Sequence, residues 1–325
     1  MPQTQTITSE LTCPYDNQGL EKYLLEYVGD DQVILYLWQN YRTVVIGKNQ
    51  NAWRECKVRE LADDGGYLAR RISGGGAVYH DLGNLNFTFV APAALYDKKR
   101  HQAVICAALQ KLGIAAEISG RNDVTVDGRK VSGNAFYESR TCFHHGTLLI
   151  SVDTAEMSRY LQVSAAKLQA KGVSSVRSRV ANLNEFYPGL TPELVAQELI
   201  RAFGELYAPP QTITRQDLDQ KRLAELTAEF ADEDWRLGSP LPATLTLGAR
   251  YPWGEIELRL TEQNTRLAQL QVYTNTMEPE LADQLQTLLV GRPFAARELA
   301  AAVRTGPFAA TIGDDLAQLL TSETY

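Results

Sequence analysis

The stretch from Arg70 to Asp81, RRISGGGAVYHD, combines two arginines with three consecutive glycines. A backbone without Cβ atoms can approach a ligand closely, and runs of its N–H groups form concavities that bind anions. An arginine just before the glycines adds a fork of donors suited to phosphate or carboxylate. A tight structural turn is the alternative, although one glycine pair usually suffices for a turn. Because Tyr79 stands where G-x-G-x-x-G needs its last glycine, and no Walker sequence occurs, we expect an anion-binding loop of another kind.

A second cluster lies between Gly120 and Tyr137, which read GRNDVTVDGRKVSGNAFY. Its Asp127-Gly128 dipeptide predicts a two-residue hairpin turn, which fixes the pairing of the flanking strands. The predicted pairing puts the valines on the core face and four polar side chains on the other: Asp123, Thr125, Lys130 and Ser132. A solvated outer face is the alternative. The small residues at positions 132–135 leave room for a ligand, so we expect a site there.

The histidines indicate a functional site less clearly than the two clusters above. His144 and His145 are adjacent and precede a predicted strand, so they point to opposite faces and at most one of them can serve a site. We expect a core or capping role for the other. His80 and Asp81 look like a base with its orienting carboxylate, but no serine or cysteine lies where a triad could be argued. We therefore expect that pair to close the glycine loop structurally.

A third glycine- and serine-rich stretch, KGVSSVRSR, runs from Lys171 to Arg179. Arg177 and Arg179 stand two residues apart among small residues. This pattern suits a loop that closes over an anion, and it equally suits a plain exposed basic loop.

The elements that must position these residues are short strands and a few helices. Apolar, β-branched runs predict strands at residues 33–38, 43–47, 68–72 and 86–90. A helix is predicted from Asp97 to Leu112, ended by Gly113, and another from a Thr191 cap and Pro192 to about Tyr207.

The pattern changes after a predicted linker at residues 232–242. Strict alternation at 255–260 and 266–273 predicts two strands, and helices follow at 279–290 and 297–303. The fold class we expect is α/β of the α+β type. Mixed β-sheets packed with helices would form a large catalytic domain, residues 1–240, followed by a small C-terminal α/β accessory domain, residues 245–325.

Composition narrows the class of protein. The 325 residues are 44% hydrophobic and 22% charged, as in ordinary soluble proteins. No apolar run reaches the ~20 residues of a membrane span, and the N-terminus lacks the regions of a signal peptide. The net charge of −7 argues against sequence-independent nucleic-acid binding. Four scattered cysteines form no C-x-x-C pair and no zinc set with the histidines, so we expect a cytoplasmic protein.

Taken together, these segments resemble the lipoate–protein ligases. The resemblance covers most of residues 1–240 and rests on five motifs in the family's order: RRISGGGAVYHDLGN (70–84), GRNDV (120–124), RKVSGNA (129–135), FHHGTLL (143–149) and KGVSSVRSRVANL (171–183). The weakly patterned C-terminal segment is similar to the accessory domain of the two-domain bacterial form of the family.

The resemblance implies a two-step reaction and assigns roles to residues. Lipoate and ATP form lipoyl-adenylate with release of pyrophosphate, and the lipoyl group then passes to a lysine of an acceptor protein. The implied catalytic residue is Lys130, which matches the lysine that touches the lipoyl carboxyl and the α-phosphate. Implied contacts to ATP and lipoyl-adenylate come from Arg71, Ser73, Gly75, Gly76, Ala77, Val78, Tyr79, Asn122, Asp123 and Lys130. Implied contacts to lipoate come from Arg71, Gly75, Lys130 and His145.

This assignment agrees with simple electrostatics. A carboxylate and an α-phosphate repel each other, so a cation such as Lys130 between them lowers the barrier without acting as a nucleophile. Asp123 beside that lysine would orient it or help to hold Mg²⁺. The resemblance also implies the acceptors, namely lipoyl domains of 2-oxoacid dehydrogenase E2 subunits and the glycine cleavage H protein. We expect a monomer that binds neither nucleic acid nor a membrane.

Several alternatives stay open at this point. An octanoyl- or lipoyl-transferase of the same superfamily works through a cysteine downstream of the histidine-glycine motif, whereas Cys142 lies upstream of it. A biotin–protein ligase shares the fold but has a different glycine loop. A non-catalytic lipoate- or nucleotide-binding protein would not require Lys130, Asp123 and the full loop together. A transferase that accepts pre-made lipoyl-adenylate is poorly separated from a full ligase by sequence.

Overall fold

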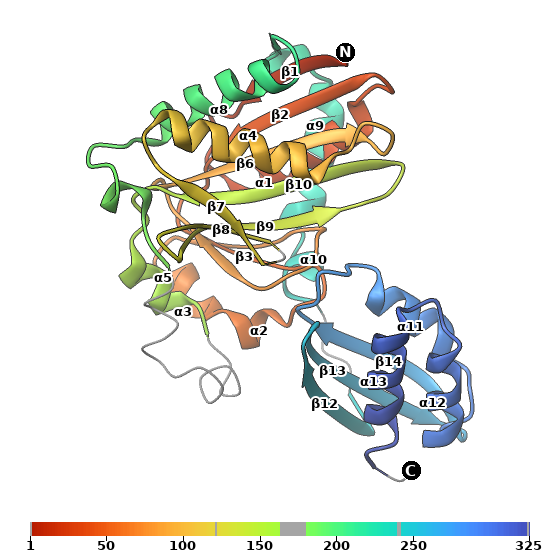
Figure 1. The fold of residues 1–325 in the computed structure, drawn as a ribbon. Helices are drawn as coiled ribbons and strands as arrows, with labels where there is room; N and C mark the ends of the chain where they lie inside the picture. The colour runs from red at the N-terminus through yellow and green to blue at the C-terminus, as the bar shows by residue number, and fades with distance from the viewer. Residues whose placement is uncertain (1, 121, 163–179, 239–241, 324) are drawn as a thin grey trace. The chain divides into compact units, whose positions relative to one another are not determined.

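The computed structural model describes residues 2–120, 122–162, 180–238, 242–323 and 325. The chain divides into two compact units (Figure 1). The first comprises Met1–Ile46, Ala52–Arg71 and Ala77–Arg236, and the second comprises Gly47–Asn51, Ile72–Gly76 and Leu237–Tyr325. The second unit therefore includes two short segments from the N-terminal half of the sequence, one of which carries the three consecutive glycines.

The first unit is built on an eight-stranded mixed sheet with the order β11-β1-β2-β6-β10-β9-β8-β7. β1 runs parallel to β2 and β11, and the other neighbours are antiparallel. The strands are β1 (Gln3–Thr8), β2 (Gln32–Trp38), β6 (Asn84–Pro92), β7 (Ala116–Ser119), β8 (Asp123–Val126), β9 (Arg129–Tyr137), β10 (Thr141–Leu149) and β11 (Gln211–Thr212).

One face of this sheet forms the main hydrophobic core. Alternate residues of β6, such as Leu85, Phe87 and Phe89, point into a cluster shared with α4 (Lys98–Lys111) and α8 (Pro192–Leu206). These two helices lie side by side over the sheet (Figure 1). Thr191 caps α8 as predicted, and Asp97, expected as the first residue of its helix, caps α4. Each side chain accepts a hydrogen bond from a backbone N–H of the first turn.

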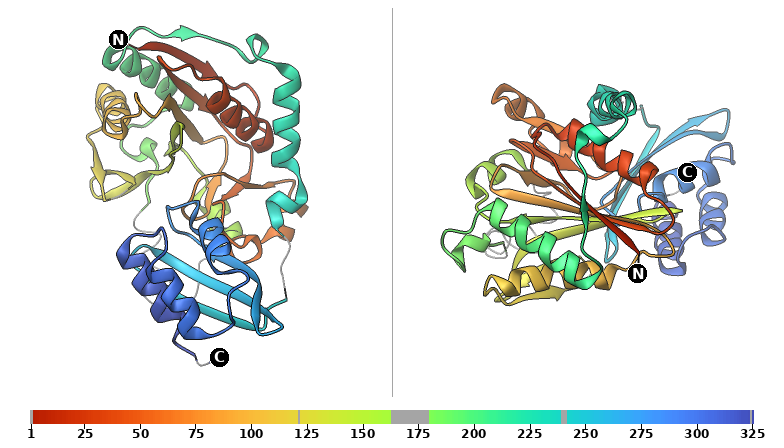
Figure 2. Two further views of the ribbon diagram at one scale, coloured as in Figure 1. Left: turned by 90° about the vertical axis from the view of Figure 1, so that its right-hand side faces the viewer. Right: turned by 90° about the horizontal axis from the view of Figure 1, so that it is seen from above.

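The opposite face of the sheet carries buried polar side chains. On β6 these are Asn84, Asn86 and Thr88, each at most 1% exposed. Helix α1 (Pro14–Tyr27) contacts β2, β6 and β10 on this side, and α9 (Gln220–Ala231) packs along α1 (Figure 2). Because a buried polar group is costly without a partner, this face must hold a hydrogen-bonded network or a ligand.

A small three-stranded sheet, β4-β3-β5, completes the first unit. It consists of β3 (Thr43–Ile46), β4 (Tyr67–Arg70) and β5 (Val78–His80), with β4 parallel and β5 antiparallel to β3. Among the described residues, the remaining short helices of this unit are α2 (Ala52–Glu55), α3 (Val58–Asp63), α5 (Thr154–Tyr160), η1 (Leu183–Glu185), η2 (Arg215–Asp217) and α10 (Glu233–Leu237).

The prediction of a linker over residues 232–242 is partly wrong, because α10 occupies its first half. Trp235 Nε1 donates to the carbonyl oxygen of Arg70, at 2.9 Å, and Arg70 Nε donates back to the carbonyl oxygen of Trp235, at 2.7 Å. The helix is therefore tied to the end of β4. Its single turn is too short to give a periodic pattern in the sequence.

The second unit has a three-stranded antiparallel sheet packed against three helices. The strands are β12 (Leu245–Tyr251), β13 (Gly254–Gln263) and β14 (Arg266–Thr274), and the helices are α11 (Leu281–Leu289), α12 (Ala296–Arg304) and α13 (Ala310–Leu320). The sequence prediction missed β12 and α13. The prediction did not include β12 because it is an edge strand in which only Leu247 is buried.

The predicted fold class is confirmed: helices pack against a large mixed sheet, and the C-terminal part has its own sheet and helices. Within the described residues, no helix has both the length and the apolar character needed to cross a membrane.

Candidate active site

Lys130 and Asp123 form an ion pair on the hairpin of β8 and β9. Lys130 Nζ lies 2.7 Å from Asp123 Oδ1, and the two side chains are 36% and 37% exposed. The turn residues Asp127 and Gly128 have φ angles of 50° and 73°, as a type I′ turn requires. A half-exposed ion pair contributes little to stability. The main effect of this ion pair is to hold the Lys130 ammonium group in place on a short hairpin.

The strand pairing departs from the prediction beyond Lys130. Thr125 pairs with Lys130 as predicted, but Val124 pairs with Ser132 and Asp123 with Gly133, because β9 contains one extra residue there. Ser132 is therefore fully buried, and its predicted position on the polar face is wrong. A two-residue turn determines the pairing only as far as the first bulge.

Gly133 leaves room for the side chain of Lys130. A Cβ atom at this position would lie 3.0 Å from Nζ and 3.1 Å from Cε of Lys130. Both distances are shorter than favourable contacts between side-chain atoms. The small residue that we expected to make room for a ligand thus first makes room for the catalytic candidate itself.

Asn122 braces the start of this hairpin. Its Nδ2 donates to the carbonyl oxygen of Asn134 at 2.9 Å, while the Nδ2 and the backbone N–H of Asn134 donate to the carbonyl oxygen of Asn122, at 2.9 and 2.8 Å. These three hydrogen bonds hold the residue before β8 against β9. The nucleotide contact expected of Asn122 remains a prediction.

Arg71 is a buried cation at the end of β4. Its side chain is 7% exposed, its backbone N–H donates to Ile46 O at 3.0 Å, and its Nη1 donates to Val45 O at 3.2 Å. Burial lowers the pKa of Arg71 to about 10, and the negative charge of Glu21 opposes that shift. The guanidinium therefore stays charged at neutral pH. A buried positive charge is a suitable place for an anionic ligand.

Glu21 is a buried partner of Arg71 and His145 that the sequence analysis missed. It lies on α1, is 2% exposed, and its Oε1 is 2.8 Å from Nδ1 of His145 on β10. The available signal was a glutamate on the same helical face as the apolar residues Leu24 and Leu25, in a helix that starts at a proline. Arg71, Glu21 and His145 thus belong to one buried cluster.

His144 lies on the opposite face of β10, as the alternation predicts. It is fully buried among Phe87, Phe89 and His101, and its Nε2 is 2.8 Å from Asn134 Oδ1. Burial, with the neighbouring histidines, lowers the pKa of His144 well below its ordinary value. His144 is therefore a core residue, and His145 is the histidine on the polar face.

His80 and Asp81 make hydrogen bonds with Asn40, Gly83 and Asp153, and the expectation that they close the glycine loop stays a prediction. His80 is 3% exposed and its Nδ1 lies 3.2 Å from Asn40 Nδ2. Burial, helped by the charge of Arg71, lowers the pKa of His80 to about 3, so the ring is neutral. The Asp81 carboxylate accepts hydrogen bonds from the backbone N–H groups of Gly83 and Asp153, each at 2.8 Å.

The glycine loop itself lies in the second unit. The N–H of Gly75 donates to the carbonyl oxygen of Thr276 at 2.8 Å, and Gly75 has a φ of 93°, in the region that favours glycine. A Cβ atom on Gly74 would overlap that same carbonyl oxygen, whereas one on Gly76 would meet nothing within 4 Å. Ser73 is fully buried, and its carbonyl oxygen accepts the N–H of Lys48 at 2.9 Å.

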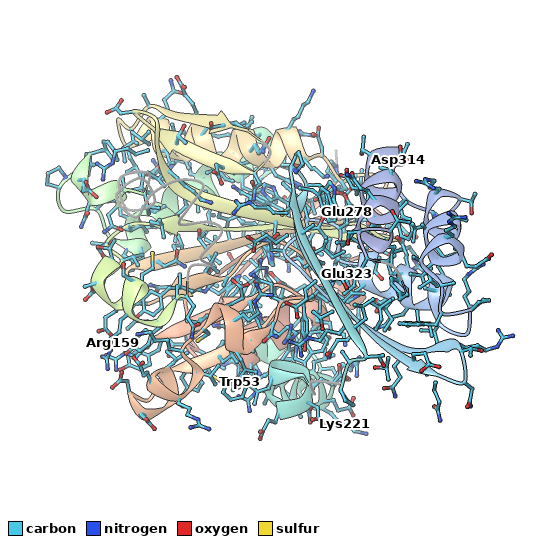
Figure 3. All side chains as sticks on the ribbon, turned by 90° about the horizontal axis from the view of Figure 1, so that it is seen from below. Trp53, Arg159, Lys221, Glu278, Asp314 and Glu323 are labelled. Carbon is cyan, nitrogen blue, oxygen red and sulfur yellow. The ribbon has the colours of Figure 1, made fainter. Side chains whose placement is uncertain are left out.

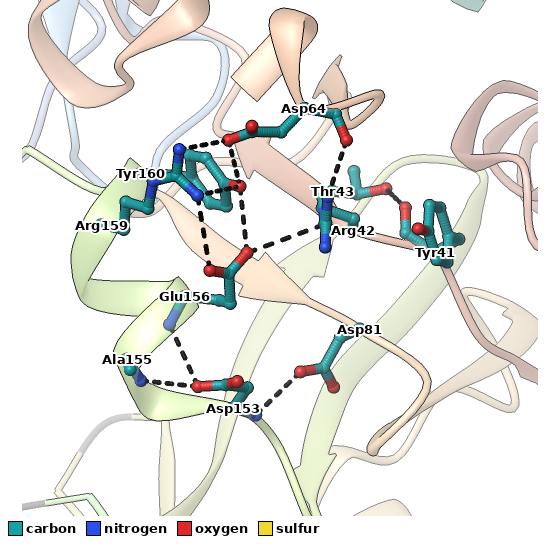
Figure 4. Close-up of polar contacts among 10 residues, drawn as sticks. All are labelled: Tyr41, Arg42, Thr43, Asp64, Asp81, Asp153, Ala155, Glu156, Arg159 and Tyr160. Atoms are coloured by element: carbon teal, nitrogen blue, oxygen red, sulfur yellow. Dashed lines mark hydrogen bonds and ion pairs between the residues drawn. The ribbon is translucent and has the colours of Figure 1, made fainter. Parts of the chain in front are cut away.

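After the loop, Ala77 leads into β5, whose Val78 pairs with Val45 of β3. The next residue, Tyr79, stacks on Tyr160 of α5, with ring centroids 6.0 Å apart. Tyr160 Oη in turn lies 2.7 Å from Asp64 Oδ2 and 3.0 Å from Glu156 Oε2 (Figure 4). This network fixes the strand that follows the glycines.

The same network reaches the surface through Arg159. Its guanidinium pairs with Asp64 at 2.6 Å, and its side chain is 46% exposed (Figures 3 and 4). α5, which carries Arg159, comes shortly before Lys171–Arg179 in the sequence. That basic stretch, with Arg177 and Arg179, lies outside the described residues.

Two further candidates can be assessed directly. Cys142, the thiol nearest to the histidine motif, is 3% exposed, and its Sγ donates to Ser139 O at 3.3 Å. Burial raises its pKa, so its thiolate is disfavoured as a nucleophile. For a metal, no group of three or more His, Cys, Asp or Glu side chains gathers among the described residues.

Comparison with known proteins gives a consistent result. Residues 13–204 match the lipoyl protein ligase A/B catalytic domain, and residues 242–320 match the bacterial lipoate protein ligase C-terminus. Lipoate-protein ligase A of Psychrobacter cryohalolentis is 38% identical over 331 residues, which covers 98% of each chain.

Three solved structures are also similar. LipL1 of P. falciparum in complex with lipoate has a TM-score of 0.86 and 26% identity, over 98% of this chain and all of the other. A bi-partite lipoate protein ligase of Thermoplasma acidophilum, described with its E2 lipoyl domain, has a TM-score of 0.63 and 26% identity, over 75% of this chain and all of the other. A lipoate-protein ligase A bound with ATP has a TM-score of 0.62 and 25% identity, over 73% and 98%.

Proposed function

Because this chain belongs to the lipoyl protein ligase A/B family, we propose that it is an ATP-dependent lipoate–protein ligase. It activates lipoate with ATP to lipoyl-adenylate and pyrophosphate, and then transfers the lipoyl group to a lysine of an acceptor protein. The observation that carries this proposal is the Lys130 ammonium, held 2.7 Å from Asp123 on the hairpin of β8 and β9. With 36% of its side chain exposed, Lys130 can reach a bound substrate.

Lys130 serves the first step. A carboxylate oxygen of lipoate attacks the α-phosphorus of ATP, and pyrophosphate leaves. The two reacting groups are both anionic, so an ammonium group near both of them stabilises the transition state more than the separated substrates. Lys130 needs no proton transfer and no covalent bond for this role. Asp123 keeps its side chain in one position, which limits the entropy lost on the way to reaction.

Arg71 and the loop bind the activated acid. The guanidinium of Arg71 keeps its charge at neutral pH, which suits a carboxylate or phosphate oxygen. For ATP and lipoyl-adenylate we propose contacts from Arg71, Ser73, Gly75, Gly76, Ala77, Val78, Tyr79, Asn122, Asp123 and Lys130. For lipoate we propose contacts from Arg71, Gly75, Lys130 and His145.

We propose that Mg²⁺ enters with ATP and is held on the protein side by Asp123. Magnesium commonly takes one or two carboxylates and fills its other positions with phosphate oxygens and water. A single carboxylate without a wider acidic cluster among the described residues fits that pattern. The ion would neutralise phosphate charge, while the Lys130 ammonium, 2.7 Å from Asp123 Oδ1, supplies its own charge nearby.

The second step needs no nucleophile from the enzyme. The ε-amine of the acceptor lysine attacks the carbonyl carbon of the mixed anhydride, AMP leaves, and an amide forms. We propose lipoyl domains of 2-oxoacid dehydrogenase E2 subunits and the glycine cleavage H protein as acceptors. The archaeal relative described with its E2 lipoyl domain supports the first of these.

The cysteine-dependent transferase is the main rival. It would need a reactive thiol, and Cys142 is buried with a raised pKa. Both observations support the ATP-dependent reaction.

The decisive experiment is intact-mass analysis of an unmodified lipoyl domain incubated with the protein, lipoate and Mg²⁺, with and without ATP. The ligase predicts a lipoyl mass gain only with ATP. A gain without ATP from a supplied lipoyl thioester would support the transferase, and a gain only from supplied lipoyl-adenylate would reduce the function to transfer. No gain under any of these conditions, with folded protein, would contradict the proposal.

We further propose that residues 1–240 form the catalytic domain and residues 245–325 an accessory domain, and that the protein is a cytoplasmic monomer. The four free cysteines support a reducing compartment. Mass photometry of the purified chain tests the monomer.

A further inference from the structure

Glu21 makes two short hydrogen bonds within the buried polar face. Its Oε1 lies 2.7 Å from Thr88 Oγ1 and 2.8 Å from His145 Nδ1. Thr88 Oγ1 also lies 3.0 Å from the indole Nε1 of Trp38. Glu21 and Thr88 come from α1 and β6, and His145 from β10, so three elements converge on one carboxylate.

The chemistry of the donors determines the direction of the hydrogen bonds that link Trp38, Thr88 and Glu21. An indole N–H can only donate, so Thr88 accepts from Trp38 with an oxygen lone pair. The single hydroxyl hydrogen of Thr88 is then given to Glu21. Arg71 is a buried cation that interacts electrostatically with Glu21. A carboxylate oxygen accepts hydrogen bonds, so the Nδ1 of His145, 2.8 Å away, is the donor to Glu21.

We propose that Glu21 is a positioning residue of the lipoate site, which fixes the ring orientation and the Nδ1–H tautomer of His145. This inference rests on the proposed contact between His145 and lipoate. In the neutral ring, Nδ1–H leaves the lone pair on Nε2. Through this hydrogen bond Glu21 favours Nδ1 as the donor nitrogen of the ring before substrate binds.

The geometry explains why this task falls to a carboxylate. His145 is 7% exposed and stacks on Phe143, with ring centroids 4.5 Å apart. A buried imidazole without a fixed partner could take either tautomer. A charge-assisted hydrogen bond is stronger than a neutral one, and Thr88 keeps the carboxylate from turning away. The same negative charge offsets Arg71 while no substrate carboxylate is present.

Histidine-labelled NMR tests the tautomer directly. The chain contains only four histidines, so ¹⁵N spectra of the full-length protein are simple, and a His145→Asn variant identifies the relevant ring. In the wild type, Nδ1 of His145 should show the protonated shift and Nε2 the unprotonated one. In Glu21→Ala the ring should move toward the other tautomer or a mixture. A wild-type ring protonated only on Nε2, or an unchanged spectrum in Glu21→Ala, would overturn the proposal.

Lipoate binding is the functional readout, measured by calorimetry without ATP. Glu21→Ala should weaken lipoate binding about tenfold, as expected for one lost charge-assisted hydrogen bond. Glu21→Gln keeps an accepting oxygen and the side-chain volume, so it should restore part of the affinity and remain informative if the alanine variant fails to fold. Equal affinity of wild type and both variants for lipoate would refute the positioning role.

Glu26→Gln is the matched control, because Glu26 lies on the same helix but pairs with Arg222 through 2.8 Å and 2.9 Å hydrogen bonds on the surface. It should change neither the spectrum of His145 nor the affinity for lipoate. If the wild-type protein itself fails to bind lipoate, the proposed function is wrong. The NMR experiment tests the effect of Glu21 on the His145 ring separately, because it needs no lipoate.

Discussion

At the scale of single residues, the chemistry depends most on the charge of Lys130. Lys130→Ala should lower the rate of lipoate-dependent pyrophosphate release 10²- to 10³-fold, roughly the effect of removing one preorganised electrostatic contact in an active site. The Tm should not change, because a half-exposed ion pair contributes at most ~1 kcal/mol. A pyrophosphate assay and thermal unfolding of the same preparations check both statements.

Lys57→Ala is a suitable control for this prediction. Lys57 also pairs with an acidic side chain, Glu60, and is 43% exposed. The substitution should leave both activity and Tm unchanged. Wild-type activity of Lys130→Ala would contradict the role of the lysine.

Gly133 tests whether the position of Lys130 matters as well as its charge. In Gly133→Ala the new methyl group would lie 3.0 Å from Nζ, so the flexible end of the lysine has to move by a few tenths of an ångström. The fold should tolerate this shift, and the rate of adenylate formation should fall about tenfold, because small displacements of reacting groups are costly. A rate equal to wild type would show that the ammonium group needs no fixed position.

At the scale of elements, the glycine loop depends on a backbone conformation that other residues adopt with difficulty. Gly75→Ala forces a Cβ atom onto a φ of 93°, at a cost of about 1–2 kcal/mol. We expect a lower Tm together with at least tenfold weaker binding of ATP, because the loop has to leave its present path. Thermal unfolding and calorimetry with ATP measure the two effects.

Gly113→Ala separates strain from function. Gly113 has a φ of 76° and follows α4, where a Cβ atom would meet nothing within 4 Å. This variant should lose similar stability and keep its activity. If Gly75→Ala kept its affinity for ATP as well, the proposed nucleotide contact of the loop would be wrong.

At the scale of the whole molecule, buried neutral histidines make stability depend on pH. Burial lowers the pKa of His80 and His101 to about 3, from 6.5, and lowers that of His144 as well. The unfolded chain therefore binds protons below pH 6.5 that the folded chain excludes. Stability is full above pH 6.5 and is lost as the pH falls toward 3, by roughly 2 kcal/mol at pH 5 for a histidine with such a shift.

His101→Phe should reduce this acid sensitivity. His101 is fully buried and stacks on Phe89 at 4.5 Å, so a phenyl ring can occupy its place. The variant should lose less stability than wild type between pH 7.5 and pH 5. Calorimetric scans of both proteins at the two pH values measure the difference, and an identical loss would show that His101 does not titrate on unfolding.

The sequence by itself determined the local parts of this protein. Thr191-Pro192 starts a helix, Asp127-Gly128 turns a hairpin, and alternation separates His144 from His145, because each of these features depends only on residues close in the chain. The motifs around the glycines and Lys130 were equally local, and they were sufficient to recognise the family.

Only the tertiary structure decided what depends on distant parts of the chain. A bulge in β9 buries Ser132, and α10 is hydrogen-bonded to the end of β4. Glu21 of α1 contacts His145, which lies 124 positions later in the sequence. The sequence also could not predict that the glycine loop groups with the C-terminal sheet and helices, because this grouping depends on contacts such as that of Gly75 with Thr276. Such contacts are set by how whole elements pack, and no local pattern of side chains encodes them.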